Sequence, residues 1–254
     1  MPDEQTNLRA HITDAEWRIR CDMAALYRLV ALYGWDDLIF THISARVPAD
    51  GGDHFLINPY GTFFAEMTAS SLVKVDIEGR AIGDNNAMIN PAGFTIHSAI
   101  HAALPDAHYV IHLHTDAMTG VSAQREGLLP LTQNALLLRP QLAYHDYEGV
   151  ALDLEERARI VNDIGSKKAL LLRNHGALTW GTTAAEAFTI IYFLEQACRQ
   201  QIAALSAGRA NLLEVPQAIQ DKVAPLSVGV GFVGQLTWPG LLRKLARENP
   251  GHDA

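Results

Sequence analysis

Two histidines on one face of a predicted strand are the residues of this sequence best suited to chemistry. In residues 109–114 (Tyr-Val-Ile-His-Leu-His), His112 and His114 alternate with apolar residues at the period of a β-strand, so both side chains point to the same face. Neutral imidazole is a good ligand for zinc, iron, nickel and copper, so a shared cation is a natural partner for such a pair. Two hydrogen-bonded core histidines are the alternative, and this motif alone leaves it open.

A third histidine favours the metal. His175 follows the apolar run 170–172 and precedes Gly176, as expected where a buried strand emerges into a loop. Three protein ligands with an open position are typical of a catalytic metal, whereas structural sites usually have four ligands. We therefore predict a metal centre formed by His112, His114 and His175.

Three further histidines are weaker candidates. His97 and His101 lie one helical turn apart on one face of the predicted helix 91–104. That spacing favours packing, or orientation of the metal ligands, over proton transfer by one of them. For His145, an interface hydrogen bond and a catalytic role are equally open.

Four charged residues near these motifs are assigned to the scaffold. Glu66 is expected in a solvated turn, and Asp116 is expected to cap the helix that follows it. Arg46 and Arg173 have the chemistry to bind a carboxylate substrate, but pairing with aspartates of the scaffold is favoured.

Length, charge and composition restrict the classes of function. The chain of 254 residues, 48% of them hydrophobic, can form one large α/β domain. A net charge of −8 without a Lys/Arg cluster argues against nucleic acid as a partner. No secretory signal and no apolar run of about 20 residues is visible, which argues against a membrane protein. Two isolated cysteines, Cys21 and Cys198, fit a reduced cytoplasmic protein.

Helices and strands are predicted to alternate along most of the chain. A capping box at 13–16 begins a helix that ends at Gly34, and Gly208 ends the longest helix, which starts at Thr183. The other predicted elements are strands at 43–47, 55–57, 72–75, 109–114 and 169–173, a strand and loop at 143–152, and helices at 91–104, from about 117, at 154–164 and at 238–244. We expect a loose arm at 1–12, one domain at 13–210, and an irregular extension at 211–254 that packs on the same domain or a neighbour. Without a Rossmann glycine pattern, this order suggests a central sheet flanked by helices.

Six motifs occur in the same order as in one known family. They are residues 41–46 (Thr-His-Ile-Ser-Ala-Arg), 68–75 (Thr-Ala-Ser-Ser-Leu-Val-Lys-Val), 90–101 (Asn-Pro-Ala-Gly-Phe-Thr-Ile-His-Ser-Ala-Ile-His), 112–115 (His-Leu-His-Thr), 143–149 (Ala-Tyr-His-Asp-Tyr-Glu-Gly) and 173–176 (Arg-Asn-His-Gly). Over residues 13–210 the sequence resembles the class II aldolase/adducin family. Its motifs are most similar to those of the adducin head domain and its bacterial relatives.

The resemblance implies a fold and a metal chemistry. It implies a three-layer αβα fold with a mostly antiparallel central sheet, assembled as a homotetramer with active sites between subunits. In the sugar-phosphate aldolases of the family, three histidines hold zinc, and they match His112, His114 and His175. The metal there polarises a carbonyl and stabilises an enediolate formed by carbon–carbon cleavage. The resemblance thus implies a divalent cation, with Zn²⁺ preferred and Mn²⁺ or Fe²⁺ as alternatives.

Other parts of the aldolase site do not match. The general acid/base Glu of those enzymes corresponds to Gly93, which cannot transfer a proton. Their phosphate pocket corresponds to His42, residues 60–61 and residues 91–92, where most hydroxyl and amide donors are missing, so a sugar phosphate is disfavoured.

The same resemblance points to a stretch that would contribute a side chain across the subunit interface. The aldolases lend a Tyr across the subunit interface from the stretch that matches 143–149, where His145 stands between Tyr144 and Tyr147. His145 and Tyr144 are therefore catalytic candidates, and His97 on the predicted helix 91–104 is the third.

Three hypotheses for the function follow. The first is a metal-dependent lyase that performs retro-aldol cleavage or decarboxylation on a small, non-phosphorylated carbonyl or carboxylate substrate. The second is a non-haem iron oxygenase. The third is a non-catalytic interaction module like the adducin head, with a cytoskeletal or assembly role.

Overall fold

The computed structural model describes residues 8–48, 52–83, 87–149 and 155–254. Its centre is a seven-stranded sheet of order β3-β2-β1-β4-β7-β6-β5, in which every neighbouring pair is antiparallel except β5 and β6. The strands are β1 (His42–Val47), β2 (His54–Ile57), β3 (Val73–Val75), β4 (Tyr109–Leu113), β5 (Leu142–His145), β6 (Ala169–Leu172) and β7 (Gly176–Gly181). The prediction of an α/β fold with a mostly antiparallel sheet is confirmed.

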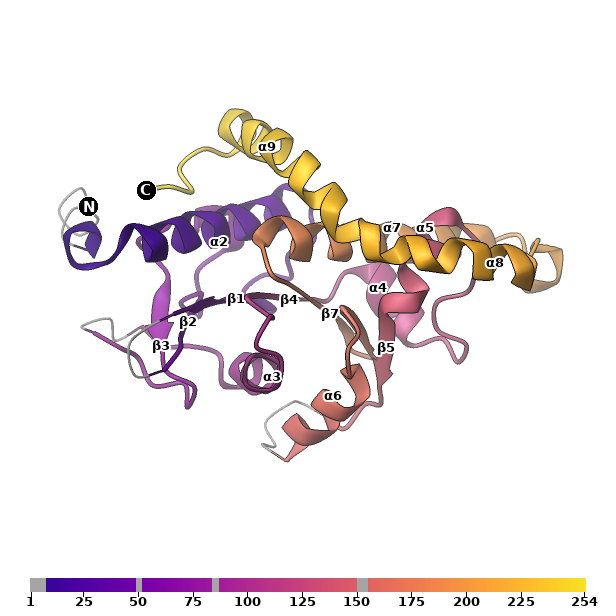
Figure 1. The fold of residues 1–254 in the computed structure, drawn as a ribbon, viewed down its shortest axis with the longest axis horizontal. Helices are drawn as coiled ribbons and strands as arrows, with labels where there is room; N and C mark the ends of the chain where they lie inside the picture. Colours follow the sequence, from indigo (N-terminus) through magenta and orange to yellow (C-terminus); the bar gives the residue numbers. More distant parts are fainter. Residues whose placement is uncertain (1–7, 49–51, 84–86, 150–154) are drawn as a thin grey trace.

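Helices cover both faces of the sheet (Figure 1). On one face lie α3 (Pro91–Ala103) and α6 (Glu156–Ile164). The opposite face carries α2 (Asp14–Leu32), α4 (Asp116–Ser122), α5 (Gln133–Leu138) and α7 (Ala184–Leu205). The short 3₁₀ helices are η1 (Phe64–Glu66), η2 (Arg139–Gln141), η3 (Arg209–Asn211) and η4 (Ala224–Gly229).

Strand alternation divides the core into two parts. Ile111 and Leu113 of β4 pack into the larger core under α2 and α7, whereas Val110 packs into the core under α3 and α6. His112 has the parity of Val110, so its side chain points towards the α3 side, as the alternation in the sequence predicted.

Local signals set the helix boundaries. Thr13 accepts a hydrogen bond from the Glu16 backbone N–H at the start of α2, and Thr183 does the same for Glu186 at the start of α7. The cap of α4 differs from the prediction, because Thr115, and not Asp116, accepts from the Met118 N–H. Asp116 lies in the first turn, where its charge complements the helix dipole.

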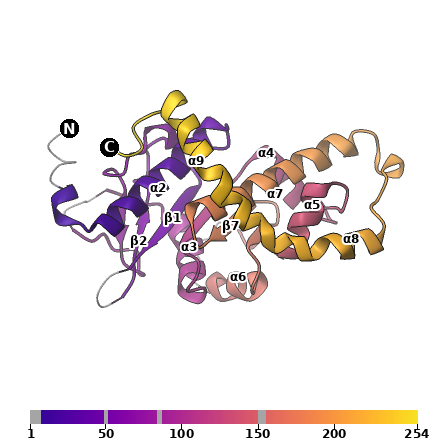
Figure 2. The ribbon, with the colours of Figure 1, turned by 45° about the horizontal axis from the view of Figure 1, so that its top comes forward.

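The C-terminal region is helical, which corrects the prediction of an irregular segment. It forms α8 (Gln217–Val223), η4 and the long α9 (Val230–Glu248), which crosses over α7 and α2 (Figure 2). The glycines that suggested a loop bring α9 close to α7. A Cβ at Gly234 would lie 2.5 Å from the Ala185 carbonyl oxygen, and one at Gly231 would lie 2.9 Å from the Glu186 carboxylate.

Two smaller differences complete the fold. Residues 8–11 of the predicted arm form a helical turn, and residues 1–7 lie outside the described part of the chain. Neither β7 nor α5 was predicted from the sequence.

In the described ranges, no helix has the length and apolar character to cross a membrane.

Candidate metal centre

The structure brings three histidine rings together at one end of the central strands. His112 is in β4, His114 follows the end of that strand, and His175 lies in the tight connection from β6 to β7. The three ring centroids are 4.7 to 4.8 Å apart, and one nitrogen from each ring lies within 4.8 Å of the others. The sequence predicted this group, and the geometry makes it a candidate metal site.

Hydrogen bonds outside the group set the orientation of two of the rings. His112 Nδ1 donates to the Ala177 carbonyl oxygen at 3.0 Å, and His114 Nδ1 donates to Asp37 Oδ2 at 3.2 Å. In the neutral rings both Nε2 atoms are then unprotonated, and they face each other at 2.9 Å. Two lone pairs at this distance repel each other unless a cation lies between them, so these residues fit a metal ion.

Burial keeps the three rings in the form that binds metal. Desolvation, followed by repulsion from His114 and His175, holds the pKa of His112 well below 6.5. Burial and the charge of His114 lower the pKa of His175 to about 4. Burial also lowers the pKa of His114, although Asp37 opposes the shift. All three rings are therefore neutral near pH 7.

The backbone around the centre adopts a conformation that is rare for residues with side chains. Asn174, directly before His175, has φ 57°, and Leu38 and Thr41 have φ 50° and 66°. Such positions cost about 1 kcal/mol or more each and cluster at functional sites. Gly176 permits a close approach of β7 to β4, because a Cβ there would lie 2.5 Å from the Leu113 carbonyl oxygen.

A cavity of about 750 Å³ reaches the centre at His114. Its lining includes four acidic residues and one arginine, namely Asp36, Asp37, Asp116, Glu195 and Arg199. The cavity is large enough for a small molecule. Its acidic lining disfavours a phosphate dianion.

His145 and Tyr144 lie on β5, away from the three rings. His145 is 3% exposed; its Nδ1 donates to Asp163 Oδ2 at 2.7 Å, and its Nε2 is 3.4 Å from Glu156 Oε1. The Tyr144 hydroxyl accepts from the Leu128 N–H, and the Arg173 guanidinium lies 4.4 Å from the centre of its ring.

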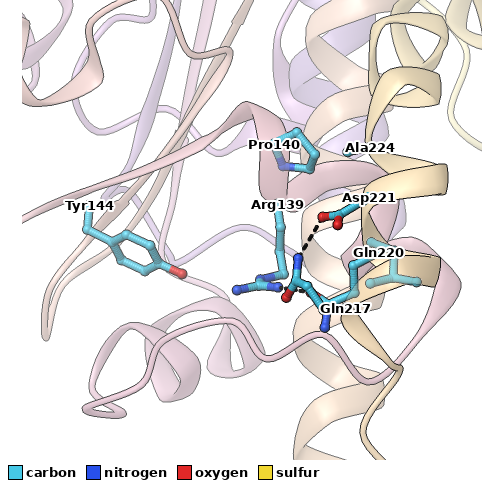
Figure 3. A pocket seen from close by; sticks show the side chains of 8 residues that line it. Arg139, Pro140, Tyr144, Gln217, Gln220, Asp221 and Ala224 are labelled. Carbon is cyan, nitrogen blue, oxygen red and sulfur yellow. Dashed lines mark hydrogen bonds between the residues drawn. The ribbon is translucent and has the colours of Figure 1, made fainter.

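Tyr144 also lines a second, separate cavity of about 280 Å³ (Figure 3). Side chains of η2 and α8 close this cavity, and Arg139 donates to Gln220 across it at 3.0 Å. None of the three clustered histidines is among its lining residues in the described part of the chain. The catalytic roles of His145 and Tyr144 stay predictions that these contacts do not favour.

His97 is buried beneath the centre. Its ring contacts His42, which stacks on His112 with a centroid distance of 5.0 Å. His97 also hydrogen-bonds to Ser44. This position agrees with a residue that orients others, which was one of the roles considered for it.

The charged residues assigned to the scaffold make scaffold contacts. Arg46 pairs with Asp53, as predicted. The predicted aspartate partner of Arg173 is not found among the described residues; its guanidinium donates to the Gln124 carbonyl oxygen at 2.8 Å. Glu66 accepts from the Phe63 N–H at 3.1 Å within an exposed turn.

Three residues at the centre were missed as functional groups, namely Asp37, His42 and Tyr147. The Tyr147 ring is 54% exposed and lies 6.4 Å from the ring of His175. Its neighbours Tyr144 and His145, which were the catalytic candidates of this stretch, lie away from the three rings. Asp37 is the second residue of an acidic pair that follows the turn after the first helix. Two carboxylates at such a position could have been recognised in the sequence as candidates to contact a metal ligand. His42 could have been recognised because it is a polar residue at the start of a buried strand.

Comparisons with known proteins show which family this chain resembles. The model of the Class II Aldolase and Adducin N-terminal domain matches residues 21–202. A Caulobacter vibrioides protein, provisionally named an aldolase class 2 protein, is 63% identical over 97% of this chain and 96% of its own length. Alpha-adducin of Rattus norvegicus is 47% identical over 200 residues, which are 77% of this chain and 27% of adducin.

Solved structures share the fold of this chain. An aldolase II superfamily protein from Pseudomonas syringae superimposes with a TM-score of 0.92 at 46% identity, covering 97% of this chain and 99% of that one. L-fuculose 1-phosphate aldolase from Glaciozyma antarctica superimposes with a TM-score of 0.79 at 27% identity, covering 93% and 92%.

Proposed function

Because this chain belongs to the class II aldolase and adducin family, we propose that it is a divalent-metal-dependent lyase for a small, non-phosphorylated carbonyl or carboxylate substrate. The reaction would be retro-aldol cleavage or decarboxylation. The observation that carries the proposal is the pair of Nε2 atoms of His112 and His114, 2.9 Å apart with both Nδ1 protons engaged elsewhere.

Zinc is the proposed metal. His112, His114 and His175 would hold it as three neutral nitrogen donors, a ligand set typical of catalytic zinc. Bound there, it would polarise the substrate carbonyl and stabilise the enolate-like charge that bond cleavage leaves. Asp37 and the Ala177 carbonyl would hold two of the rings in the ligating orientation.

Tyr147 is the residue of 143–149 to which we assign proton return. Its ring lies 6.4 Å from His175 and is exposed to solvent. A phenol is a general acid that can donate a proton to a carbanion formed beside the metal. Gly93 cannot supply that proton.

The proposed assembly is a homotetramer with the sites between subunits. Apolar side chains are exposed beside the centre, with Leu38 at 65% and Phe40 at 44%. A neighbouring subunit that covers them would also exclude water from the cavity. Light scattering should then give four times the chain mass of 27.8 kDa.

Metal content tests the function. We expect one zinc per purified chain, and retro-aldol cleavage of 3-hydroxy carbonyl compounds or decarboxylation of 3-oxo acids that stops when a chelator removes the metal. Bound iron with oxygen-dependent turnover would instead identify an oxygenase.

A binding module without catalysis is the second candidate, because position 93 lacks the carboxylate and the chain is 47% identical to alpha-adducin over their matched region. Absence of metal from the purified protein, with unchanged stability in His112→Ala, would favour this module over the lyase.

A further inference from the structure

A chain of buried polar side chains runs from the metal centre between the sheet and α3. It consists of His42 and Ser44 on β1 and His97 and His101 on α3. Each is at most 4% exposed, although imidazoles and hydroxyls are costly to bury without partners. Desolvation lowers the pKa of His101 to about 3 and holds that of His97 well below 6.5, so these two rings are neutral.

One carbonyl determines where every proton of this chain lies. The Ala107 oxygen only accepts, so His101 donates from Nδ1 at 2.8 Å and its neutral Nε2 must accept. Ser44 Oγ therefore donates its single proton to His101 Nε2 at 2.7 Å, and accepts from His97 Nδ1. His97 Nε2 then accepts from His42 Nδ1 at 2.8 Å. The unprotonated nitrogen at the end of the chain is His42 Nε2.

This nitrogen lies at the metal centre, in the space of a missing side chain. The His42 ring stacks on His112 with an interplanar angle of 29°. A Cβ built on Gly93 would lie 2.3 Å from His42 Cδ2 and 2.5 Å from His42 Nε2. The imidazole therefore fills the volume into which a side chain at 93 would project. Among the described residues, none hydrogen-bonds to His42 Nε2.

We propose that His42 Nε2 accepts a hydrogen bond from a substrate hydroxyl next to the metal-bound carbonyl or carboxyl group, so that the site selects 2-hydroxy compounds over their ethers and phosphate esters. The inference rests on the proposed function and names its substrate class. A lone pair attracts a hydroxyl proton, whereas an ether or a phosphate dianion offers no proton and is repelled. His97, Ser44 and His101 are positioning residues that fix the tautomer of His42.

A matched pair of small ligands tests the assignment. Glycolate and methoxyacetate share a carboxylate and an adjacent oxygen, but only glycolate has a hydroxyl proton. Calorimetric titration of the zinc-loaded protein should show glycolate binding about tenfold more tightly, the effect of one hydrogen bond. In His42→Phe, which keeps a ring of similar shape, the ratio should fall to about one. The control His108→Phe alters an exposed histidine elsewhere on the sheet and should leave the ratio unchanged.

A spectroscopic measurement tests the tautomers in the wild-type protein without a ligand. Long-range ¹H–¹⁵N spectra of wild-type protein should show His42, His97 and His101 protonated on Nδ1. Ser44→Ala should allow His97 and His42 to populate both tautomers.

The possible failures are distinguishable. Equal binding of the two ligands by zinc-loaded wild type, or a proton on His42 Nε2, would overturn the assignment and leave the metal centre intact. Failure of the protein to bind zinc would overturn the proposed function, and this inference with it.

Discussion

Two groups of histidines lie on the same sheet, and their partners differ. At the metal centre, His112, His114 and His175 face one another, and the carboxylate that contacts the group, Asp37, binds a nitrogen on the outer side. On β5, His145 lies between two carboxylates, with Asp163 at 2.7 Å and Glu156 at 3.4 Å. The β5 histidine has a carboxylate of its own chain at Nδ1, and among the described residues its Nε2 has no hydrogen-bond partner. In the group of three rings, the Nε2 atoms of His112 and His114 face each other at 2.9 Å, where the proposed cation would separate them.

The largest expected contrast comes from removing one imidazole from each group. His112→Ala, His114→Ala and His175→Ala should each abolish metal binding and leave the fold largely intact, because the ligands lie at strand ends. His145→Ala should keep the metal but lower the free energy of unfolding by about 2 kcal/mol, since it leaves Glu156 and Asp163 without their partner. Metal analysis and urea denaturation measure the two effects. Full metal occupancy in any of the first three variants would remove that residue from the centre.

Acid should destabilise the metal-free protein through the buried rings. His175 and His42 have folded-state pKa values of about 4 and 3, below the value of about 6.5 expected in the unfolded chain. Between these values the unfolded state binds more protons, so stability is complete above pH 6.5 and is lost as the pH falls towards 4. Denaturation of the apoprotein from pH 7.5 to 4.5 measures the loss. In His175→Gln the slope should be smaller, and an unchanged slope would show that His175 does not contribute.

Matched substitutions of the two aspartates sharpen the comparison. Asp37→Asn weakens the partner of His114 Nδ1, and such changes typically reduce metal affinity 10- to 100-fold. Asp163→Asn, which weakens the partner of His145 Nδ1, should reduce stability without changing metal affinity. Competition with a chromophoric chelator gives both affinities. Equal effects of the two substitutions on zinc affinity would remove the distinction between the two groups.

How much the sequence predicted depended on whether the signal was local. The three clustered histidines were found because strand alternation and strand ends are local patterns. His42 and Asp37 reach the centre through a loop whose residues Leu38 and Thr41 have positive φ, which no local pattern indicates.

The missed elements have a similar origin. β7 begins and ends at a glycine, which is typical of turns, and its pairing with β4 and β6 is visible only in the fold. The glycines of α9 suggested a loop because their close packing on α7 is visible only in the fold.

The smallest expected effect, that of Gly93→Ala, tests whether His42 lies at the metal centre or is a packing residue. Gly93 does not have a positive φ, so Gly93→Ala meets only the clash with the His42 ring and should cost about 1–3 kcal/mol. With His42→Ala the ring is gone and the same methyl group fits, so a double-mutant cycle on the free energy of unfolding should give a coupling of at least about 1 kcal/mol. Gly229→Ala is the control, because that glycine has open space around its Cβ position and φ −79°. Additive costs would mean that His42 does not occupy the space of side chain 93, and the imidazole would then be a packing residue with no direct position at the metal centre.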